Sequence, residues 1–271
     1  MVDYSKYKFI KVEKKDGVAI LTLNNPDAMN AIGKPEHAEI EHIFEDMNED
    51  QEVKAVILTG AGRAFSAGGD INLMVEGYTN HEIRISSTSV KRIVLNLLNC
   101  RKPVIAALNG ACAGLGATLA LQCDVVIASE KARIGDPHIG VGILPGDGGC
   151  IIWPLLVGMC KAKQYLMTGE MVNAVDAERM GLITKVVPPD KLMEEAWAWA
   201  SRFANGPFLA ISLTKMSLNK ILIDRINLLF DTTIAYEYHT LNAPDHLEAA
   251  KGFLEKRPPK YTSGDTDPFV F

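Results

Sequence analysis

The segment from Ala106 to Ser129, AALNGACAGLGATLALQCDVVIAS, constrains the fold of this chain more than any other. It contains two short apolar strands, separated by a glycine-bearing turn and a helix of small residues. Such a turn leaves the backbone N–H groups at the start of the helix without partners inside the helix. These N–H groups can stabilise an oxyanion or another developing negative charge. The segment therefore predicts a helix between two buried strands, with a site for negative charge at its start.

Strands and helices alternate along the first two thirds of the chain. Short apolar runs bounded by turn residues predict strands at residues 10–12, 18–23, 56–59, 104–108 and 125–129. Apolar residues at helical spacing predict helices at residues 37–48 and 90–98. This alternation, with short connections, is typical of an α/β fold.

After Pro189 the pattern changes to helices with no strand between them. Apolar spacing predicts helices at residues 192–205, 209–222, 224–241 and 246–256. Prolines and a glycine predict an irregular tail from Arg257 onward. We place a boundary near residue 200, which divides the chain into an α/β core of residues 1–200 and a helical region of residues 201–271.

Composition excludes several classes of protein. An apolar content of 48% is typical of a globular chain, and a net charge of −5 argues against a nucleic-acid-binding protein. The N-terminus lacks the apolar core of a signal peptide, and no apolar run approaches the ~20 residues of a membrane span. The five cysteines include no CxxC pair, which favours reduced thiols. We expect a cytoplasmic protein that binds neither nucleic acid nor membrane.

Five ordered segments together resemble the enoyl-CoA hydratase/isomerase superfamily, the crotonases. The two most specific are Ala64 to Ile71, AFSAGGDI, and Asn109 to Asp124. The other three are residues 23–31, residues 137–149, and residues 161–169 with 176–187. The resemblance implies a crotonase-like spiral of repeated ββα units, followed by a helical C-terminal region that mediates trimer formation. It is less specific for the reaction, since this superfamily catalyses several reactions with one oxyanion hole.

In that superfamily two backbone N–H groups polarise a thioester carbonyl and stabilise the enolate that forms from it. By position, the resemblance assigns these donors to Gly69 and Leu115. Losing one such donor typically costs ~3 kcal/mol of transition-state stabilisation. The alternative for each loop is a tight turn that holds no ligand.

The resemblance also implies that coenzyme A enters as part of the substrate, with no tightly bound cofactor and no metal. The candidates for lining the coenzyme A and substrate pocket are Arg63, Ala64, Ser66, Ala67, Asp70, Ile71, Asn72, Gly116 and Thr118. A solvated surface charge is the alternative for Arg63. A basic cluster near the C-terminus resembles the region by which a neighbouring subunit touches the coenzyme A phosphates; its members are Lys251, Lys256, Arg257 and Lys260. The alternative is cation placement at a helix C-terminus. The implied partners are copies of the same chain, in a homotrimer or a dimer of trimers.

The sequence departs from the resemblance at the proton-transfer groups. Hydratases of the superfamily use two glutamates, and the matching positions hold Thr118 and His138. A threonine hydroxyl is a poor base at neutral pH, whereas histidine, with a pKa of about 6.5, can act as an acid or a base. Asp147 lies one short loop further on. We take His138 and Asp147 as the catalytic candidates; the alternatives are a histidine that only shapes the pocket and an aspartate that caps a helix.

These observations predict an acyl-CoA enzyme, in the first place an enoyl-CoA hydratase with unusual proton-transfer residues. The alternatives are an enoyl- or dienoyl-CoA isomerase, a thioester or ring-cleaving hydrolase, and, from a different class, an acyl-CoA-binding protein without catalysis. An apolar acyl pocket is predicted from Met74, Val75, Tyr78 and Ile143, and residues 74–80 are expected to form a mobile loop.

Overall fold

The computed structural model describes residues 2–72 and 87–262, and within these ranges the strands form two sheets. The larger sheet has the strand order β1-β2-β3-β5-β7-β10, and the smaller has the order β4-β6-β8-β9. The strands of the larger sheet are β1 (Ile10–Lys15), β2 (Val18–Leu23), β3 (Ala55–Gly60), β5 (Val104–Leu108), β7 (Val125–Ser129) and β10 (Lys185–Val187). Those of the smaller are β4 (Ala64–Ser66), β6 (Ala111–Ala113), β8 (Arg133–Gly135) and β9 (Val172–Asn173).

Successive turns of the chain each contribute one strand to each sheet. β3 is followed by β4, β5 by β6 and β7 by β8, and the three strands in each sheet pair in parallel. Val56 lies opposite Val104, for example, and Ile105 opposite Val125. Every residue of β3, β5 and β7 is buried, as is typical of parallel strands covered on both faces. The predicted α/β architecture is confirmed, and the repeated unit is the predicted spiral.

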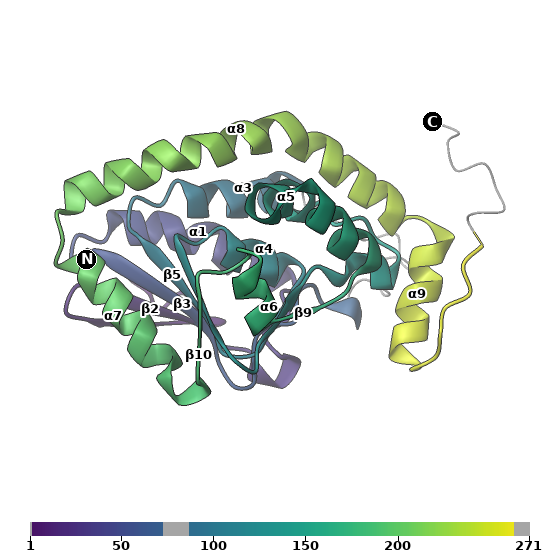
Figure 1. Cartoon of the computed structure of the whole chain (residues 1–271), viewed down its shortest axis with the longest axis horizontal. Coiled ribbons are helices and arrows are strands. Elements are labelled where there is room, and N and C mark those ends of the chain that lie inside the picture. The colour runs from purple at the N-terminus through teal and green to yellow at the C-terminus, as the bar shows by residue number, and fades with distance from the viewer. Residues whose placement is uncertain (1, 73–86, 263–271) are drawn as a thin grey trace.

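Helices cover both faces of the larger sheet. Val56 and Val104 belong to the apolar core formed with α1 (Lys34–Glu49) and α3 (Ser87–Leu98). Ile57 and Ile105, one residue further along the same strands, pack with α7 (Leu192–Ala204). Because successive side chains of a strand point to opposite faces, α7 lies on the face opposite α1 and α3. Figure 1 shows α7 apart from α1 and α3.

The long helix that follows α7 lies over α3 and α5 (Gly149–Thr168). Residues 208–241 form one helix, α8 (Phe208–Leu241), so the prediction of two helices was wrong. The physical reason is that no glycine or proline interrupts this stretch. Phe230 and Ile234 of α8 pack in one cluster with residues of α3 and α5, and Figure 1 shows α8 running along the top of the molecule above both. Residue 200 falls inside α7, and the division into two domains stays a prediction.

The remaining elements are short, and several border the smaller sheet. They are η1 (Pro26–Ala28), α4 (Leu115–Leu121), η2 (Pro137–Val141), α6 (Ala174–Arg179), η3 (Pro189–Lys191) and α9 (Pro244–Leu254). The helix predicted between the strands of the segment from Ala106 to Ser129 is confirmed as α4. None of the helices in the described ranges is long and apolar enough to cross a membrane.

Candidate active site

The smaller sheet brings three loops to one edge. β4 is followed by the loop with Gly69, β6 by Leu115, and β8 by Asp136 and His138. These three strands are parallel neighbours, so their carboxyl ends lie at the same edge of the sheet. Residues far apart in the sequence therefore meet at one place because of strand pairing.

The two loops predicted to hold the oxyanion donors touch each other. A Cβ atom added at Gly68 would lie 2.9 Å from the carbonyl oxygen of Ala113, and one at Gly114 would lie 3.7 Å from the Gly68 Cα. Leu115 is the first residue of α4, so its N–H group has no partner inside the helix. Among the hydrogen bonds of the described residues, none uses the N–H group of Gly69 or of Leu115. Two unused backbone donors thus lie on adjacent loops.

Two cavities meet beside these donors. The inner cavity, of about 90 Å³, is lined by Gly69, Leu115 and His138 together with carboxyl groups and apolar side chains described below. The outer cavity, of about 190 Å³, is lined by Gly69, His138, the Gly114 loop, η2 and Phe253 of α9. Because Gly69 and His138 border both cavities, the arrangement suits a ligand with its long arm in the outer cavity and its reactive end in the inner one.

His138 lies between two carboxyl groups. Its Nδ1 atom is hydrogen-bonded to Asp136, and its Nε2 atom is 3.7 Å from Asp147 Oδ2. Burial lowers the pKa of His138, but the charges of Asp136 and Asp147 outweigh burial and raise this pKa well above the usual value. The two carboxylates therefore favour the protonated, imidazolium form of the ring. It can donate a proton or hold Asp147 by charge, but it has no free nitrogen with which to accept a proton.

Asp147 is buried next to α4. Its Oδ1 atom accepts a hydrogen bond from the Thr118 hydroxyl at 3.3 Å, and its carboxyl group also accepts one from the backbone of Gly149. Burial raises the pKa of Asp147 to about 6, against the lowering effect of His138. The bond from Gly149, the first residue of α5, resembles the alternative capping role. Asp147 also lines the inner cavity, where the catalytic role would place it, and this role stays a prediction.

The inner cavity contains a second carboxyl group that the sequence motifs did not point to. Glu237 of α8 lines this cavity together with Asp147, and its Oε2 atom is buried without a hydrogen-bond partner among the described residues. Burial, with the charge of Asp147, raises the pKa of Glu237 to about 8. The signal was present in the sequence, because Glu237 falls at helical spacing from the buried Ile234 and Leu241. A glutamate on the apolar face of a helix is a candidate for a functional group.

Two glycines of the later loop allow the carboxyl groups to approach. A Cβ atom at Gly146 would lie 2.3 Å from the Thr233 carbonyl oxygen and 2.8 Å from Glu237 Cβ, so only glycine lets α8 come this near. Gly148 has a φ of +143°, and its Cβ would lie 2.5 Å from Thr118 Cγ2. The glycine-rich loop therefore places Asp147 against α4 and leaves room for Glu237.

Gly148→Ala is expected to lower both stability and activity. The added methyl group would overlap Thr118 and would require a backbone conformation that alanine rarely adopts. We expect a loss of about 1–3 kcal/mol in the free energy of unfolding, measured by urea denaturation. Gly140→Ala is the matched control, since a Cβ there would meet no atom within 4 Å. Equal stability of the two variants would contradict this description of the loop.

The candidates for coenzyme A contacts are divided between cavity wall and interior. Ala67 and Ile71 line the outer cavity, and Asp70 and the exposed Asn72 lie beside them, with the Asn72 N–H bonded to the Asp70 carboxylate at 2.9 Å. The remaining candidates for coenzyme A contacts differ in their solvent exposure. Arg63 is exposed, whereas Ala64, Ser66, Gly116 and Thr118 are buried.

Ser66 has a supporting position under the first loop. Its hydroxyl donates to the Asn30 carbonyl oxygen at 2.8 Å and accepts from the Gly68 N–H at 3.2 Å. A Cβ atom at Gly116 would lie 2.6 Å from Ser66 Cβ, so Ser66 also packs directly against α4. These contacts hold the two donor loops together and leave the Ser66 hydroxyl no free surface for a ligand.

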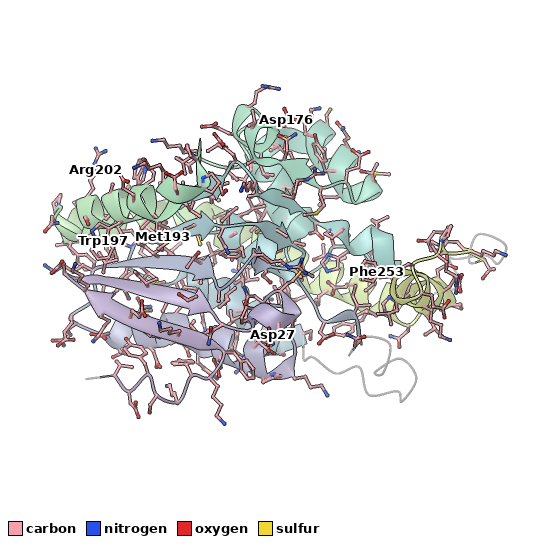
Figure 2. All side chains as sticks on the ribbon, turned by 90° about the horizontal axis from the view of Figure 1, so that it is seen from below. Asp27, Asp176, Met193, Trp197, Arg202 and Phe253 are labelled. Carbon is pink, nitrogen blue, oxygen red and sulfur yellow. The ribbon has the colours of Figure 1, made fainter. Side chains whose placement is uncertain are left out.

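The basic cluster near the C-terminus lies beside Phe253. The Phe253 side chain is 60% exposed and borders the outer cavity of its own chain. Figure 2 shows it on α9, at the opposite end of the molecule from Trp197 and Arg202 of α7. Arg257 is paired with Glu248 at 2.6 Å, so its charge is partly neutralised.

The residues predicted to line the acyl pocket are not among the described residues that line the two cavities. Met74, Val75 and Tyr78, with the predicted loop of residues 74–80, lie outside the described residues. Ile143 is 1% exposed and lines neither of the two cavities.

Three groups at the site have ligand atoms close enough to hold a metal ion. Oxygen and nitrogen atoms of Asp136, His138 and Asp147 lie within 4.8 Å of one another. A histidine must lose its ring proton to bind a metal, and the two carboxylates oppose this loss by raising the pKa of His138. The protonated ring itself balances the charge of the carboxylates, so this arrangement suits a buried ion triad better than a metal site.

Comparison with known proteins identifies the family. Residues 13–264 match the family described as "Enoyl-CoA hydratase/isomerase". The chain belongs to the enoyl-CoA hydratase/isomerase family. The predicted assignment to the crotonase superfamily is thereby confirmed. The members of this family are enzymes, as the sequence predicted for this chain.

Individual relatives cover nearly the whole chain. A protein of Clostridium acetobutylicum named "Short-chain-enoyl-CoA hydratase" is 38% identical over 91% of this chain and 94% of its own length. A protein of Syntrophomonas wolfei named "Crotonyl-CoA hydratase" is 37% identical over 95% of this chain and 99% of its own length. The crystal structure of an enoyl-CoA hydratase/isomerase from Mycobacterium paratuberculosis superimposes with a TM-score of 0.86, at 33% identity, over 92% of this chain and 99% of the other. The crotonase-like fold with its helical C-terminal region is thereby confirmed.

Proposed function

We propose that this protein is an enoyl-CoA hydratase, which adds water across the α,β-double bond of an acyl-CoA. The observation that carries the proposal is one cavity with two unused backbone donors, Gly69 and Leu115, and two carboxyl groups, Asp147 and Glu237. The similarity to relatives named short-chain-enoyl-CoA hydratase and crotonyl-CoA hydratase supports the same reaction.

In the proposed reaction the backbone donors act on the thioester carbonyl. The N–H groups of Gly69 and Leu115 bind its oxygen, which withdraws electrons from the double bond and makes carbon three electrophilic. Attack by water at carbon three moves negative charge onto this oxygen and gives an enolate. Donors that are already in position cost no reorganisation when this charge develops.

The two carboxyl groups are assigned by their pKa values. With a pKa of about 6, Asp147 is largely ionised at neutral pH and accepts the proton of the attacking water. With a pKa of about 8, Glu237 is largely protonated and donates a proton to carbon two of the enolate. Two titratable groups whose environments separate their pKa values are a common sign of such a division of roles.

The proton balance of this cycle is complete. Asp147 gains one proton from water and Glu237 loses one to carbon two, so the product is a 3-hydroxyacyl-CoA. The resting state returns when Asp147 releases its proton and Glu237 takes one up. Coenzyme A takes part only as a portion of the substrate, and no tightly bound cofactor is needed.

The role of His138 in this proposal is to hold Asp147. The imidazolium lies 3.7 Å from Asp147 Oδ2 and favours the ionised form of this carboxyl group. Its hydrogen bond to Asp136 fixes the orientation of the ring. This differs from the prediction that His138 itself transfers a proton in place of a glutamate.

An enoyl- or dienoyl-CoA isomerase is the second candidate. It is favoured by the same observation, because Asp147 and Glu237 face one small cavity and could carry a proton from one carbon of the acyl chain to another. Isomerisation needs no water molecule, so the two reactions leave different products.

Incubation with crotonyl-CoA tests the proposed function. Hydration removes the conjugated thioester absorbance, and mass spectrometry shows the product to be heavier by one water. Deuterium incorporation without addition of water would instead show an isomerase, and release of free thiol would show a hydrolase. Binding of crotonyl-CoA with no change in any of these assays would overturn the enzymatic proposal.

We also propose that the chain works in the cytoplasm as a homotrimer or a dimer of trimers. Exposed apolar residues along α8, among them Leu213, Leu218 and Leu228, support an interface between copies of the chain. Sedimentation analysis tests the assembly, and a monomer at micromolar concentration would contradict it.

A further inference from the structure

A buried histidine of α1 lines the inner cavity and has an unpaired ring nitrogen. His37 is 3% exposed and lines this cavity, as do Val90 and Leu241. Its Nε2 atom is buried and has no hydrogen-bond partner among the described residues. Buried polar atoms in folded proteins are normally paired, so this atom is available to a ligand.

The neighbours of His37 determine which ring nitrogen carries the proton. Ser89 Oγ donates a hydrogen bond to Glu41 and also lies 3.1 Å from His37 Nδ1. Glu41 can only accept, since Arg92 pairs with it at 2.8 Å. A serine hydroxyl has a single proton, so Ser89 must accept its second hydrogen bond from His37 Nδ1–H. Nε2 is therefore the bare, accepting nitrogen.

The ring is neutral at working pH. Burial lowers the pKa of His37 to about 4, and the charge of Glu41 offsets this only in part. A neutral ring with its proton on Nδ1 can accept a hydrogen bond at Nε2 but cannot donate one there. The cavity wall also contains the apolar side chains of Ile32, Val90 and Ile234. His138, Glu237 and Tyr238 also line this cavity, but none of them is hydrogen-bonded to His37 Nε2, so the bound molecule is the source of a donor that we consider.

We propose that the inner cavity selects an acyl group that carries a hydroxyl group beyond the reacting carbons, with this hydroxyl donating a hydrogen bond to His37 Nε2. The inference rests on the proposed function, because it describes the substrate of the same site. A purely hydrocarbon acyl chain would exclude water from His37 Nε2 without donating a hydrogen bond to it. Sites with buried polar groups discriminate strongly against analogues that leave those groups unpaired.

Binding of saturated acyl-CoA pairs tests this selectivity without depending on hydration. In each pair a hydroxyl replaces a terminal methyl group: pentanoyl-CoA with 4-hydroxybutanoyl-CoA, and hexanoyl-CoA with 5-hydroxypentanoyl-CoA. We expect calorimetry to show that the hydroxylated member of at least one pair binds about 10- to 100-fold more tightly. His37→Phe should abolish this preference, and His42→Phe, an exposed position on the same helix, should keep it.

A second variant keeps the imidazole ring of His37 and changes only which ring nitrogen carries the proton. Ser89→Ala removes the acceptor of Nδ1–H, so the ring proton is no longer held away from Nε2, and the hydroxyl preference should fall. No preference in the unmodified protein, or a preference unchanged in both His37→Phe and Ser89→Ala, would overturn the inference. A hydroxyl preference with no hydration of any enoyl-CoA would instead overturn the proposed function and leave this inference standing.

Discussion

Asp147→Asn is expected to lower kcat for hydration of crotonyl-CoA by about 10²- to 10⁴-fold. The asparagine side chain has nearly the same shape and can still accept a hydrogen bond from Thr118, which donates to Asp147 at 3.3 Å in the unmodified protein. It cannot accept a proton from water, so the loss reports on proton transfer and not on packing. Stopped-flow measurement of the conjugated thioester absorbance gives the rate.

The control for this variant is an aspartate outside the site. Asp176 is 46% exposed and pairs with Arg179, so Asp176→Asn should leave kcat within about twofold of the unmodified protein. Far-ultraviolet circular dichroism should show both variants folded. An Asp147→Asn protein that keeps more than half of the unmodified activity would exclude Asp147 as the base.

Glu237→Gln is expected to lower kcat by about 10²-fold or more and to change the pH dependence of the reaction. Glutamine fills the same space between Ile234 and Leu241 of α8 but has no proton to give to carbon two. Asp231→Asn is the matched control on the same helix, because Asp231 is 76% exposed and pairs with Lys91. Loss of activity in both variants would indicate that the substitutions disturb α8, and would contradict a role of Glu237 in proton transfer.

The pH profile of kcat/KM gives an independent test of the two assignments. Asp147 must be ionised to accept a proton, so activity should rise with pH through about 6. Glu237 must be protonated to donate one, so activity should fall as pH rises through about 8. The residual activity of Glu237→Gln should lose the fall at high pH and keep the rise at low pH. An unchanged high-pH limb in this variant would assign the acid to another group.

The sequence predicted the parts of the site that depend on local pattern. The resemblance assigned the backbone donors to Gly69 and Leu115, and the pairing of β4 with β6 brings the loops of these two residues together. His138 and Asp147 were found because the later loop matches a family segment. Gly148 lets the loop that holds Asp147 approach Thr118.

The sequence could not supply the contacts made by distant helices. Glu237 reaches the cavity only because α8 is one continuous helix that packs over α3 and α5, and the prediction had divided this helix in two. Asp136 was overlooked since its partner His138 is two residues away, and no spacing rule marks such a pair. His37 lies on the apolar face of α1 with Ile40 and Phe44, but its unpaired nitrogen depends on Ser89, 52 residues further along the chain.

The proposed mechanism requires the N–H groups of Gly69 and Leu115 to converge on one oxygen atom, which a crystal structure with bound butanoyl-CoA would show. We expect the thioester oxygen to lie about 3 Å from both backbone nitrogen atoms, with the acyl group in the inner cavity beside Asp147 and Glu237. A thioester oxygen that contacts only one of the two nitrogen atoms, or neither, would contradict it.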